Sequence, residues 1–232
     1  AFPYQQQAFH GGEHAAIEHL QQYFRRGLAN SYKATRNNLS AVDDSTKFSP
    51  WLARGSLSAP QVDQALKDFE AEHGANDSTY WIYFELLWRD YFRLLHLKYG
   101  RLLYRASGLK GTREPGHNPQ GFARWCRGET GEALIDAGMR ELAATGYLSN
   151  RMRQIVASYL IFDLKGDWRA GAAWFEAQLV DYDVYSNQGN WLYIAGYGTD
   201  PRGGRRFNTT KQADEHDTDG AYPVSYTHLT LP

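Results

Sequence analysis

The chain has 232 residues, of which 42% are hydrophobic and 22% charged, and its formal net charge is −1. These proportions are typical of a folded globular protein and exclude general disorder. Because the net charge is near zero, any nucleic-acid site must be a local basic patch. The single cysteine, Cys126, excludes an intramolecular disulfide, so a reducing, intracellular setting is expected.

Several classes of function lose support because their motifs are missing from the sequence. The eight histidines show no metal-ligand spacing, so no metal site is expected. A nucleophile elbow, a Walker lysine loop and a glycine-rich dinucleotide turn are all absent. The longest apolar run, residues 155–162, is far shorter than the ~20 residues of a membrane helix, and residues 1–10 lack a signal-peptide pattern. We therefore expect no membrane partner.

In the first half of the chain, apolar residues recur at helical intervals. Side chains from Ile17 to Leu28 are spaced by three and four residues, which predicts one buried stripe. Ser58 and Gln61 form a capping-box pattern and predict a helix start. The stretch Ser78–Tyr99 is apolar nearly all round and is followed by Gly100, which predicts a helix of about 30 Å at the centre of the core.

The second half of the chain continues the same pattern. Further helices are predicted at 131–145, closed by Gly146, at 149–164, and at 167–179 with Asp167 as cap. Loops are predicted at 107–121, 183–190 and 196–204, and an irregular tail at 209–232. Because strand alternation is almost missing, the expected fold class is all-α.

Glu85 is a candidate functional residue because it lies inside the most apolar predicted helix. A buried carboxylate without a partner is costly. In one interpretation, Glu85 pairs with Arg89 one turn later and is purely structural. In the other, it lines a cavity beside Trp88 and meets the polar edge of a ligand. The sequence pattern leaves both interpretations open.

Asn150, Arg151 and Arg153 open the predicted 149–164 helix. Arginine at a helix start is unfavourable because its charge opposes the helix dipole. In one interpretation these arginines have no function and are simply exposed to solvent. The alternative is a phosphate-bearing or flavin-sized ligand at this helix end.

Two further polar segments could contact such a ligand. Residues 181–191 contain Asp181, Asp183, Asn187 and Trp191, and residues 45–49 offer hydroxyl and backbone N–H groups. Aspartate and asparagine commonly make turns, but they also accept hydrogen bonds from ribose hydroxyls and ring N–H groups. Together the segments suggest a helical domain around a large polar, aromatic cofactor.

The order of these segments resembles the photolyase/cryptochrome family, specifically its DASH-type cryptochromes, over about residues 11–222. The matching segments are Tyr32–Asn37, Ser45–Trp51, Phe84–Phe92, Gly146–Arg153, Val156–Ser158, Asp167–Arg169, Val180–Asp183, Ser186–Asn187, Gly189–Tyr193 and Phe207–Asn208. The resemblance implies an all-helical domain that holds FAD in a bent form. It also implies an N-terminal antenna domain, missing here, with an antenna chromophore that we expect to be a folate.

The resemblance implies a set of residues that contact FAD. This set is Tyr32, Ser45, Thr46, Lys47, Phe48, Ser49, Glu85, Arg89, Asn150, Arg153, Asp181, Asp183 and Asn187. Within it, Arg153 is expected to pair with Asp181, and Asn187 to face N5 of the flavin, where it would favour the reduced form.

Catalytic and substrate-binding residues are implied in the same way. The implied catalytic residues are Glu85, Asn187 and an electron relay of Trp191 nearest the flavin, then Trp168, then Trp125 near the surface. The implied substrate contacts are Glu85, Trp88, Arg151, Gln154 and Tyr193.

Some positions depart from the family pattern. Tyr147 and Tyr193 stand where many duplex-repairing photolyases carry tryptophan, and Gln154 replaces a usual methionine, which would weaken stacking on a flipped dimer. The terminal pattern of the family ends near Val224. We therefore expect a linker remnant at 1–12, the helical domain at 13–208, and a tail at 209–232 that is foreign from about residue 224.

The expected function is blue-light-dependent, FAD-driven repair of cyclobutane pyrimidine dimers by a lyase, mainly in single-stranded or distorted DNA, with RNA as a further partner. The alternative is a non-catalytic blue-light sensor that binds nucleic acid and regulates transcription or signalling. A monomer is expected, cytoplasmic in a bacterium and organellar in a eukaryote.

Overall fold

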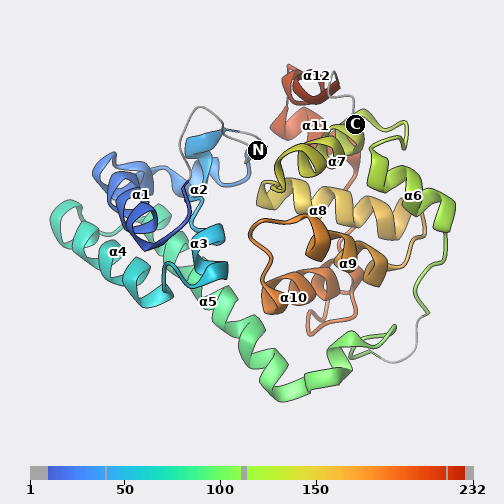
Figure 1. The fold of residues 1–232 in the computed structure, drawn as a ribbon, viewed down its shortest axis with the longest axis horizontal. Coiled ribbons are helices and arrows are strands. Elements are labelled where there is room, and N and C mark those ends of the chain that lie inside the picture. The colour runs from blue at the N-terminus through green and yellow to red at the C-terminus, as the bar shows by residue number, and fades with distance from the viewer. Residues whose placement is uncertain (1–9, 40, 111–113, 218, 228–232) are drawn as a thin grey trace.

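The computed structural model describes residues 10–39, 41–110, 114–217 and 219–227, and all regular structure within these ranges is helical (Figure 1). The α-helices are α1 Glu13–Arg25, α2 Tyr32–Thr35, α3 Ser49–Arg54, α4 Ala59–His73, α5 Asp77–Tyr99, α6 Pro119–Arg127, α7 Ala133–Thr145, α8 Asn150–Ser158, α9 Trp168–Gln178, α10 Val184–Ala195, α11 Thr209–His216 and α12 Ala221–Thr227. Short 3-10 helices occupy Leu28–Asn30, Val42–Asp44 and Gly100–Tyr104, and a π-helix occupies Tyr159–Asp163. The predicted all-α class is confirmed.

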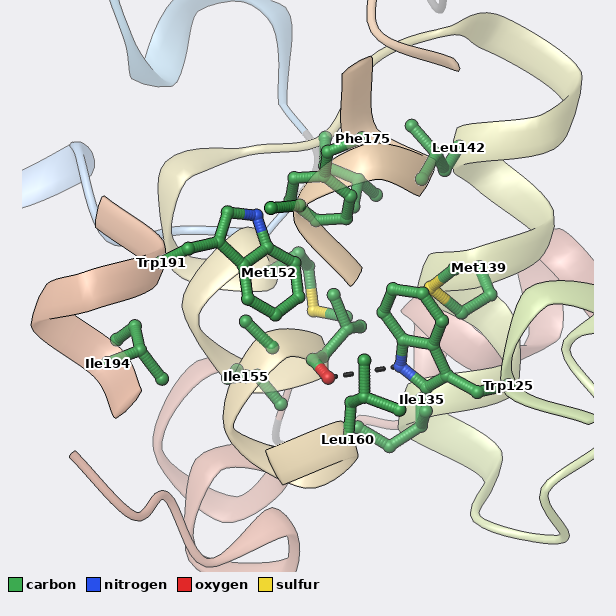
Figure 2. Packing of buried hydrophobic residues seen from close by; sticks show 14 of the residues in the cluster. Trp125, Ile135, Met139, Leu142, Met152, Ile155, Leu160, Phe175, Trp191 and Ile194 are labelled. Atoms are coloured by element: carbon green, nitrogen blue, oxygen red, sulfur yellow. Dashed lines mark hydrogen bonds between the residues drawn. The ribbon is translucent and has the colours of Figure 1, made fainter. Parts of the chain in front are cut away.

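Two hydrophobic cores divide the helices into two lobes (Figure 1). The first core joins α1 to α4 and the start of α5, and it includes Phe48 and Trp51. The second core joins α6 to α10, and at its centre Trp125 and Trp191 meet Phe175 (Figure 2). Helix α5 runs from the first lobe to the second, so the space between the lobes has α5 as one wall.

Several predicted helix ends are confirmed. The Ser58 hydroxyl accepts from the backbone N–H of Gln61, and the Gln61 side chain accepts from the backbone N–H of Ser58 at 2.8 Å, which makes the capping box of α4. Asp167 caps α9 by accepting from the backbone N–H of Arg169. Gly146 ends α7 with φ of 69°, a left-handed conformation that glycine adopts without strain.

Two expectations for the first half need correction. Helix α5 has the predicted bounds to within one residue, but it is not central to a core: Leu94 is 61% exposed and Leu97 is 78% exposed. Its apolar side chains divide among the first core, which includes Ile82, the cavity wall, the edge of the second core, where Leu95 packs, and the protein surface. The stripe predicted from Ile17 to Leu28 is carried by two elements rather than one, since α1 ends at Arg25 and Leu28 packs on the first core from the following 3-10 helix.

Other corrections concern the second half. Residues 183–190 are not a loop, because Asp183 accepts from the backbone N–H of Ser186 and starts α10. The predicted 149–164 helix changes to a π-helix after Ser158. The tail is not irregular up to residue 227: α11 and α12 pack on α7, where the buried Tyr222 hydroxyl donates to Glu141.

Parts of the sequence-based division lie outside the described residues. These are residues 1–9 of the predicted linker remnant, residues 111–113 of the predicted 107–121 loop, and residues 218 and 228–232 of the tail. Among the described helices, none combines the length and the apolar character that a membrane crossing requires.

Candidate functional site

A cavity of about 500 Å³ lies between the two lobes. One side is formed by α2, the segment 45–49 and α5, and the other by α8, α10 and the segment that precedes α10. Most of the residues expected to bind cofactor or substrate line it. These are Tyr32, Ser45, Thr46, Lys47, Ser49, Glu85, Trp88, Arg89, Asn150, Arg153, Gln154, Asp181, Asp183, Asn187, Trp191 and Tyr193.

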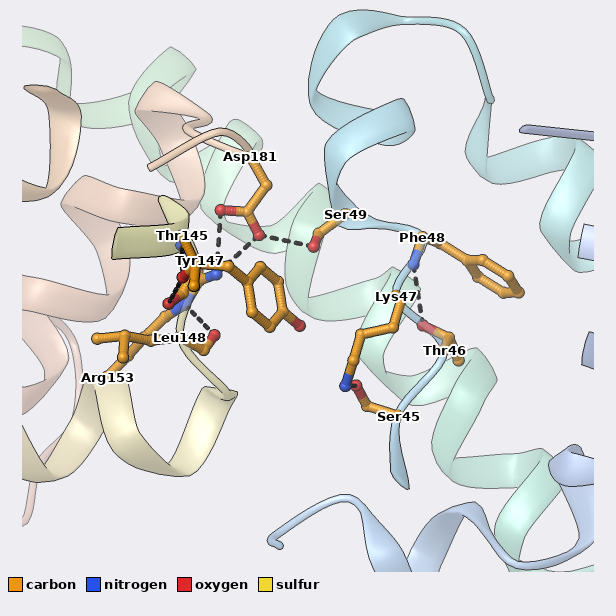
Figure 3. A network of polar contacts seen from close by, with 10 residues as sticks. All are labelled: Ser45, Thr46, Lys47, Phe48, Ser49, Thr145, Tyr147, Leu148, Arg153 and Asp181. Carbon is orange, nitrogen blue, oxygen red and sulfur yellow. Dashed lines mark hydrogen bonds and ion pairs between the residues drawn. The ribbon is translucent and has the colours of Figure 1, made fainter. Parts of the chain in front are cut away.

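Two residues that were expected to contact ligand do not line this cavity. The Phe48 ring is buried in the first lobe beside Tyr23, 5.3 Å between ring centroids, and points away from Asp181 (Figure 3). Arg151 donates to the Asn37 side chain at 2.9 Å and lies over the ring of Phe207. Neither side chain is therefore among the residues that line the cavity.

The three tryptophans of the expected relay are all buried. Trp125 has no exposed surface, so its predicted place near the surface is wrong. It lies edge-on to Trp191, with ring centroids 6.4 Å apart, and its indole N–H donates to the Val156 carbonyl (Figure 2). Trp168 lies beside Tyr197, also at 6.4 Å, and donates to the Ala106 carbonyl. Of the three, only Trp191 lines the cavity.

An ion pair fixes one wall of the cavity. Arg153 of α8 donates from Nη2 to both carboxylate oxygens of Asp181, at 3.0 and 2.8 Å (Figure 3). Ser49, at the start of α3, donates to the same carboxylate at 2.6 Å. The Asp181 side chain is only 2% exposed, so its charge depends on these donors. The expected pair is thus present within the second lobe, and the hydrogen bond from Ser49 joins it to the first lobe.

Lys47 is held in an unusual backbone conformation at the cavity. Its φ is 55°, in the left-handed region that residues other than glycine seldom adopt. The ammonium group donates to the Ser45 hydroxyl at 2.7 Å and lies 5.6 Å from the centre of the Tyr147 ring. Burial lowers the pKa of Lys47 to about 8. Lys47 is therefore a cation at neutral pH, next to the hydroxyl groups of the 45–49 segment.

Glu85 has a partner that the sequence reasoning missed. Its carboxylate pairs with the guanidinium of Arg36, not with Arg89, which instead donates to the Leu52 carbonyl. Arg36 also lies over the ring of Trp81, 4.0 Å from its centre. Burial raises the pKa of Glu85, while Arg36 opposes that rise. The available signal was the position of Arg36 inside the matching segment Tyr32–Asn37.

The start of α10 brings two further polar side chains to the cavity. Asp183 caps the helix, and Asn187, one turn later, donates from its amide nitrogen to the Ala172 carbonyl at 3.0 Å. The capping bond and this amide bond orient the two side chains while both still line the cavity. Asp183 thus offers a carboxylate acceptor, and Asn187 offers an amide, on the cavity wall formed by α10.

The donor set of the cavity suits a large cofactor with an anionic part and a flat ring system. The ammonium of Lys47 and the adjacent hydroxyls can donate to phosphate oxygens. The carboxylate of Asp183 can accept from hydroxyl or ring N–H groups, and Trp191 supplies a ring face. The volume falls in the usual range of ~300–1,000 Å³ for small-molecule sites. Within the described ranges, no cluster of histidine, cysteine and acidic side chains could hold a metal ion.

Comparison with known proteins agrees with this donor set. Residues 81–228 match the family described as the FAD binding domain of DNA photolyase. Cryptochrome DASH of Idiomarina loihiensis is 52% identical over 92% of this chain and 48% of that protein. The crystal structure of a Synechocystis sp. cryptochrome superimposes with a TM-score of 0.90 at 50% identity, covering 95% of this chain and 46% of that one.

An archaeal photolyase from Sulfolobus tokodaii, described with two FAD molecules, is 29% identical with a TM-score of 0.73, and the match covers 95% of this chain and 47% of that one. The chain therefore belongs to the photolyase/cryptochrome family, as its motifs indicated. Within that family it is of the DASH type, the type named for its curated relatives at 50–53% identity. The chain spans less than half of the length of these relatives.

Proposed function

We propose that this chain binds FAD in the cavity between its lobes. The observation that carries the proposal is the convergence of Lys47, the hydroxyls of residues 45–49 and the Arg153–Asp181 pair on a cavity that also has a tryptophan wall. Lys47 and Ser45 would hold the diphosphate, and Asp183 would accept from the ribose or the ring edge. Asn187 would lie at the flavin ring.

We further propose that the bound cofactor serves repair of cyclobutane pyrimidine dimers. When bound and reduced, FAD would supply the light-driven electron that splits the dimer. The chain would supply the site: Trp88, Tyr193 and Gln154 line the cavity together with Glu85 and would bind the dimer there. Because a dimer must leave the base stack to enter, single-stranded or distorted DNA is the favoured substrate.

The carboxyl group of Glu85 would carry a proton or form a hydrogen bond at the edge of the dimer. Its carboxylate is desolvated, which raises its pKa, yet Arg36 keeps a positive charge beside it. A carboxylate that is desolvated, beside a cation and at a cavity is typical of a functional site, where it can form a hydrogen bond to a polar group of the substrate. The proposal therefore gives Glu85 a role in repair and Arg36 a role in positioning Glu85.

The second candidate is a non-catalytic light sensor that binds nucleic acid and regulates transcription or signalling. Tyrosine at positions 147 and 193 favours it, since a phenol ring offers less stacking area than an indole. Illumination of the reduced, FAD-loaded chain with a dimer-containing single-stranded oligonucleotide separates the two. Loss of dimers under blue light supports repair, and unchanged dimers with retained binding support the sensor.

The family resemblance extends the proposal to partners and setting. We propose DNA as the main partner and RNA as a second one, a monomer in solution, and an intracellular location, with a folate antenna elsewhere in the complete protein. Binding would weaken steeply as salt rises, because phosphate contacts release counterions. An affinity that is independent of salt would contradict this part of the proposal.

A further inference from the structure

A second, smaller cavity lies behind the aromatic wall of the first. Its volume is about 270 Å³, and we call it the ring pocket. Its apolar lining includes Trp88, Tyr91, Phe92, Leu95, Leu192 and Tyr193. A space of this size, just below the ~300 Å³ of the smallest common ligand sites, fits one planar ring system.

The ring pocket and the first cavity share part of their lining. Trp88, Phe92 and Tyr193 line both cavities. The ring centroids of Trp88 and Tyr193 lie 6.3 Å apart with an angle of 66° between the ring planes, and the Trp88 ring also meets Tyr91 edge-on. These three side chains therefore form a common wall, so the ring pocket is adjacent to the site proposed for the dimer.

The rim of the ring pocket is positively charged. Arg202, whose side chain is 70% exposed, and Arg205 share the single carboxylate of Asp200. Lys110 donates to the backbone carbonyl of Asp200 at 2.6 Å and adds a third cation. The guanidinium of Arg205 also lies over the ring of Tyr193, 4.9 Å from its centre. Cations beside an aromatic pocket are the combination that single-stranded nucleic acid requires.

A hydrogen bond holds this rim against α5. The Tyr91 hydroxyl and the Thr199 hydroxyl lie 2.6 Å apart, so the segment that carries Arg202 is attached to the helix that forms the pocket floor. The backbone N–H of Arg202 donates to Asp200 at 2.9 Å, which fixes the turn. These two hydrogen bonds place the segment that carries the cations next to the rings of the pocket.

We propose that the ring pocket receives the base next to the dimer in the same DNA strand, while Arg202 contacts the phosphate of that nucleotide. This inference rests on the proposed function, because it assumes a dimer in the first cavity. Stacking in the ring pocket would hold the strand in register and would favour single strands, whose neighbouring base is free to turn. The ligand class is a nucleobase attached to a pyrimidine dimer.

The test uses the FAD-loaded chain and a single-stranded oligonucleotide with one thymine dimer and 2-aminopurine beside it, on the 5′ or the 3′ side. Stacking on aromatic rings quenches 2-aminopurine, so binding should lower its fluorescence by about twofold or more on one side only. Leu95→Trp fills the ring pocket from a residue that does not line the first cavity. Leu94→Trp, on the exposed neighbour, is the matched control.

Leu95→Trp should abolish the quenching and weaken oligonucleotide binding about tenfold, to the level of an oligonucleotide that is abasic beside the dimer. Leu94→Trp should change neither. Leu95→Ala, which enlarges the pocket, is the second variant in case Leu95→Trp does not fold, and it should reduce the quenching in part. Two results would overturn this inference while leaving the proposed function intact, provided that the dimer still binds. One is the absence of quenching in the wild type, and the other is equal quenching in the wild type and in Leu95→Trp. Binding of the isolated dimer dinucleotide tests the first cavity separately. If neither this dinucleotide nor any of the oligonucleotides binds, the proposed function is overturned as well.

Discussion

The carboxylate of Glu85 on α5 is paired with the guanidinium of Arg36, which follows α2 in the chain, and the two residues are 49 positions apart. The pair crosses from one helix to another at the cavity edge, and Arg36 is itself held over the ring of Trp81. Glu85 is therefore supported from outside its own helix. This geometry leaves the carboxylate at the cavity rather than locked against Arg89.

Replacement of Glu85 tests its role at the dimer. Glu85→Gln should lower the repair yield about tenfold, equal to ~1.4 kcal/mol, because the amide keeps the shape but loses the charge. FAD content, measured by visible absorption, should stay unchanged. Asp90→Asn, an exposed carboxylate on the same helix, is the control and should repair as wild type does. Full activity in Glu85→Gln would remove the residue from the mechanism.

The buried ammonium of Lys47 predicts a pH dependence of FAD affinity. Its pKa is lowered to about 8 by burial, so the positive charge that would face the phosphates of bound FAD is lost as the pH rises above about 8. FAD affinity should therefore fall from pH 8 to pH 9.5, by up to about tenfold per pH unit. Titration with FAD at each pH measures this directly.

The matched pair for this measurement is Lys47→Gln and Lys33→Gln. Lys47→Gln should bind FAD weakly at neutral pH and lose the pH dependence. Lys33, which is half-exposed and pairs with Asp77, lies outside the cavity lining, so its variant should keep the wild-type profile. An identical pH profile in Lys47→Gln and wild type would show that another group titrates.

The buried tryptophans predict separate effects on photoreduction and on repair. Trp168→Phe should slow photoreduction of the oxidised, FAD-loaded chain about tenfold or more, while repair by the chemically reduced chain is spared. Trp174→Phe on the same helix serves as control. Because Trp125 contacts Trp191 directly, Trp125→Phe should be measured in parallel. If photoreduction is retained in Trp168→Phe but lost in Trp125→Phe, electron transfer to Trp191 passes through Trp125 and not through Trp168.

Glu141 predicts how stability changes with pH. Burial raises the pKa of this carboxyl to about 7, above its ordinary value of 4.5, despite a hydrogen bond from Tyr222. The folded chain thus binds more protons than the unfolded chain between pH 4.5 and 7, so stability falls as the pH rises through that window. The loss should be on the order of 3 kcal/mol or less.

Thermal unfolding at pH 5 and pH 7 checks the effect of Glu141. Glu141→Gln should flatten the difference in Tm between the two pH values, because the amide does not titrate. Glu129→Gln, at an exposed carboxylate, should leave the difference as in wild type. A Tm that rises from pH 5 to pH 7 to the same extent in both variants would contradict the assignment.

Local patterns predicted the helices well where a cap or a glycine marks the end. Ser58, Asp167 and Gly146 act at the expected positions. The prediction failed at Asp183, where residues typical of turns instead cap a helix and face a cavity. Periodicity also could not tell whether the apolar surface of α5 faces a core, a cavity or solvent, since all three accept the same side chains.

The candidate site was predicted largely through the ordered motifs. They gathered Lys47, Arg153 and Asp181 from segments far apart in the chain, and the structure places these around one cavity. The partner of Glu85 was missed because an interhelix pair has no sequence spacing. The exposure of Trp125 was also mispredicted, since a motif match carries over the order of residues but not their depth in this chain.

The most direct test of the central claim is the visible absorption of the folded chain after addition of excess FAD and removal of the unbound cofactor. The account predicts a yellow protein whose flavin absorption bleaches under blue light in the presence of an electron donor. A folded chain that remains colourless after this treatment would contradict it.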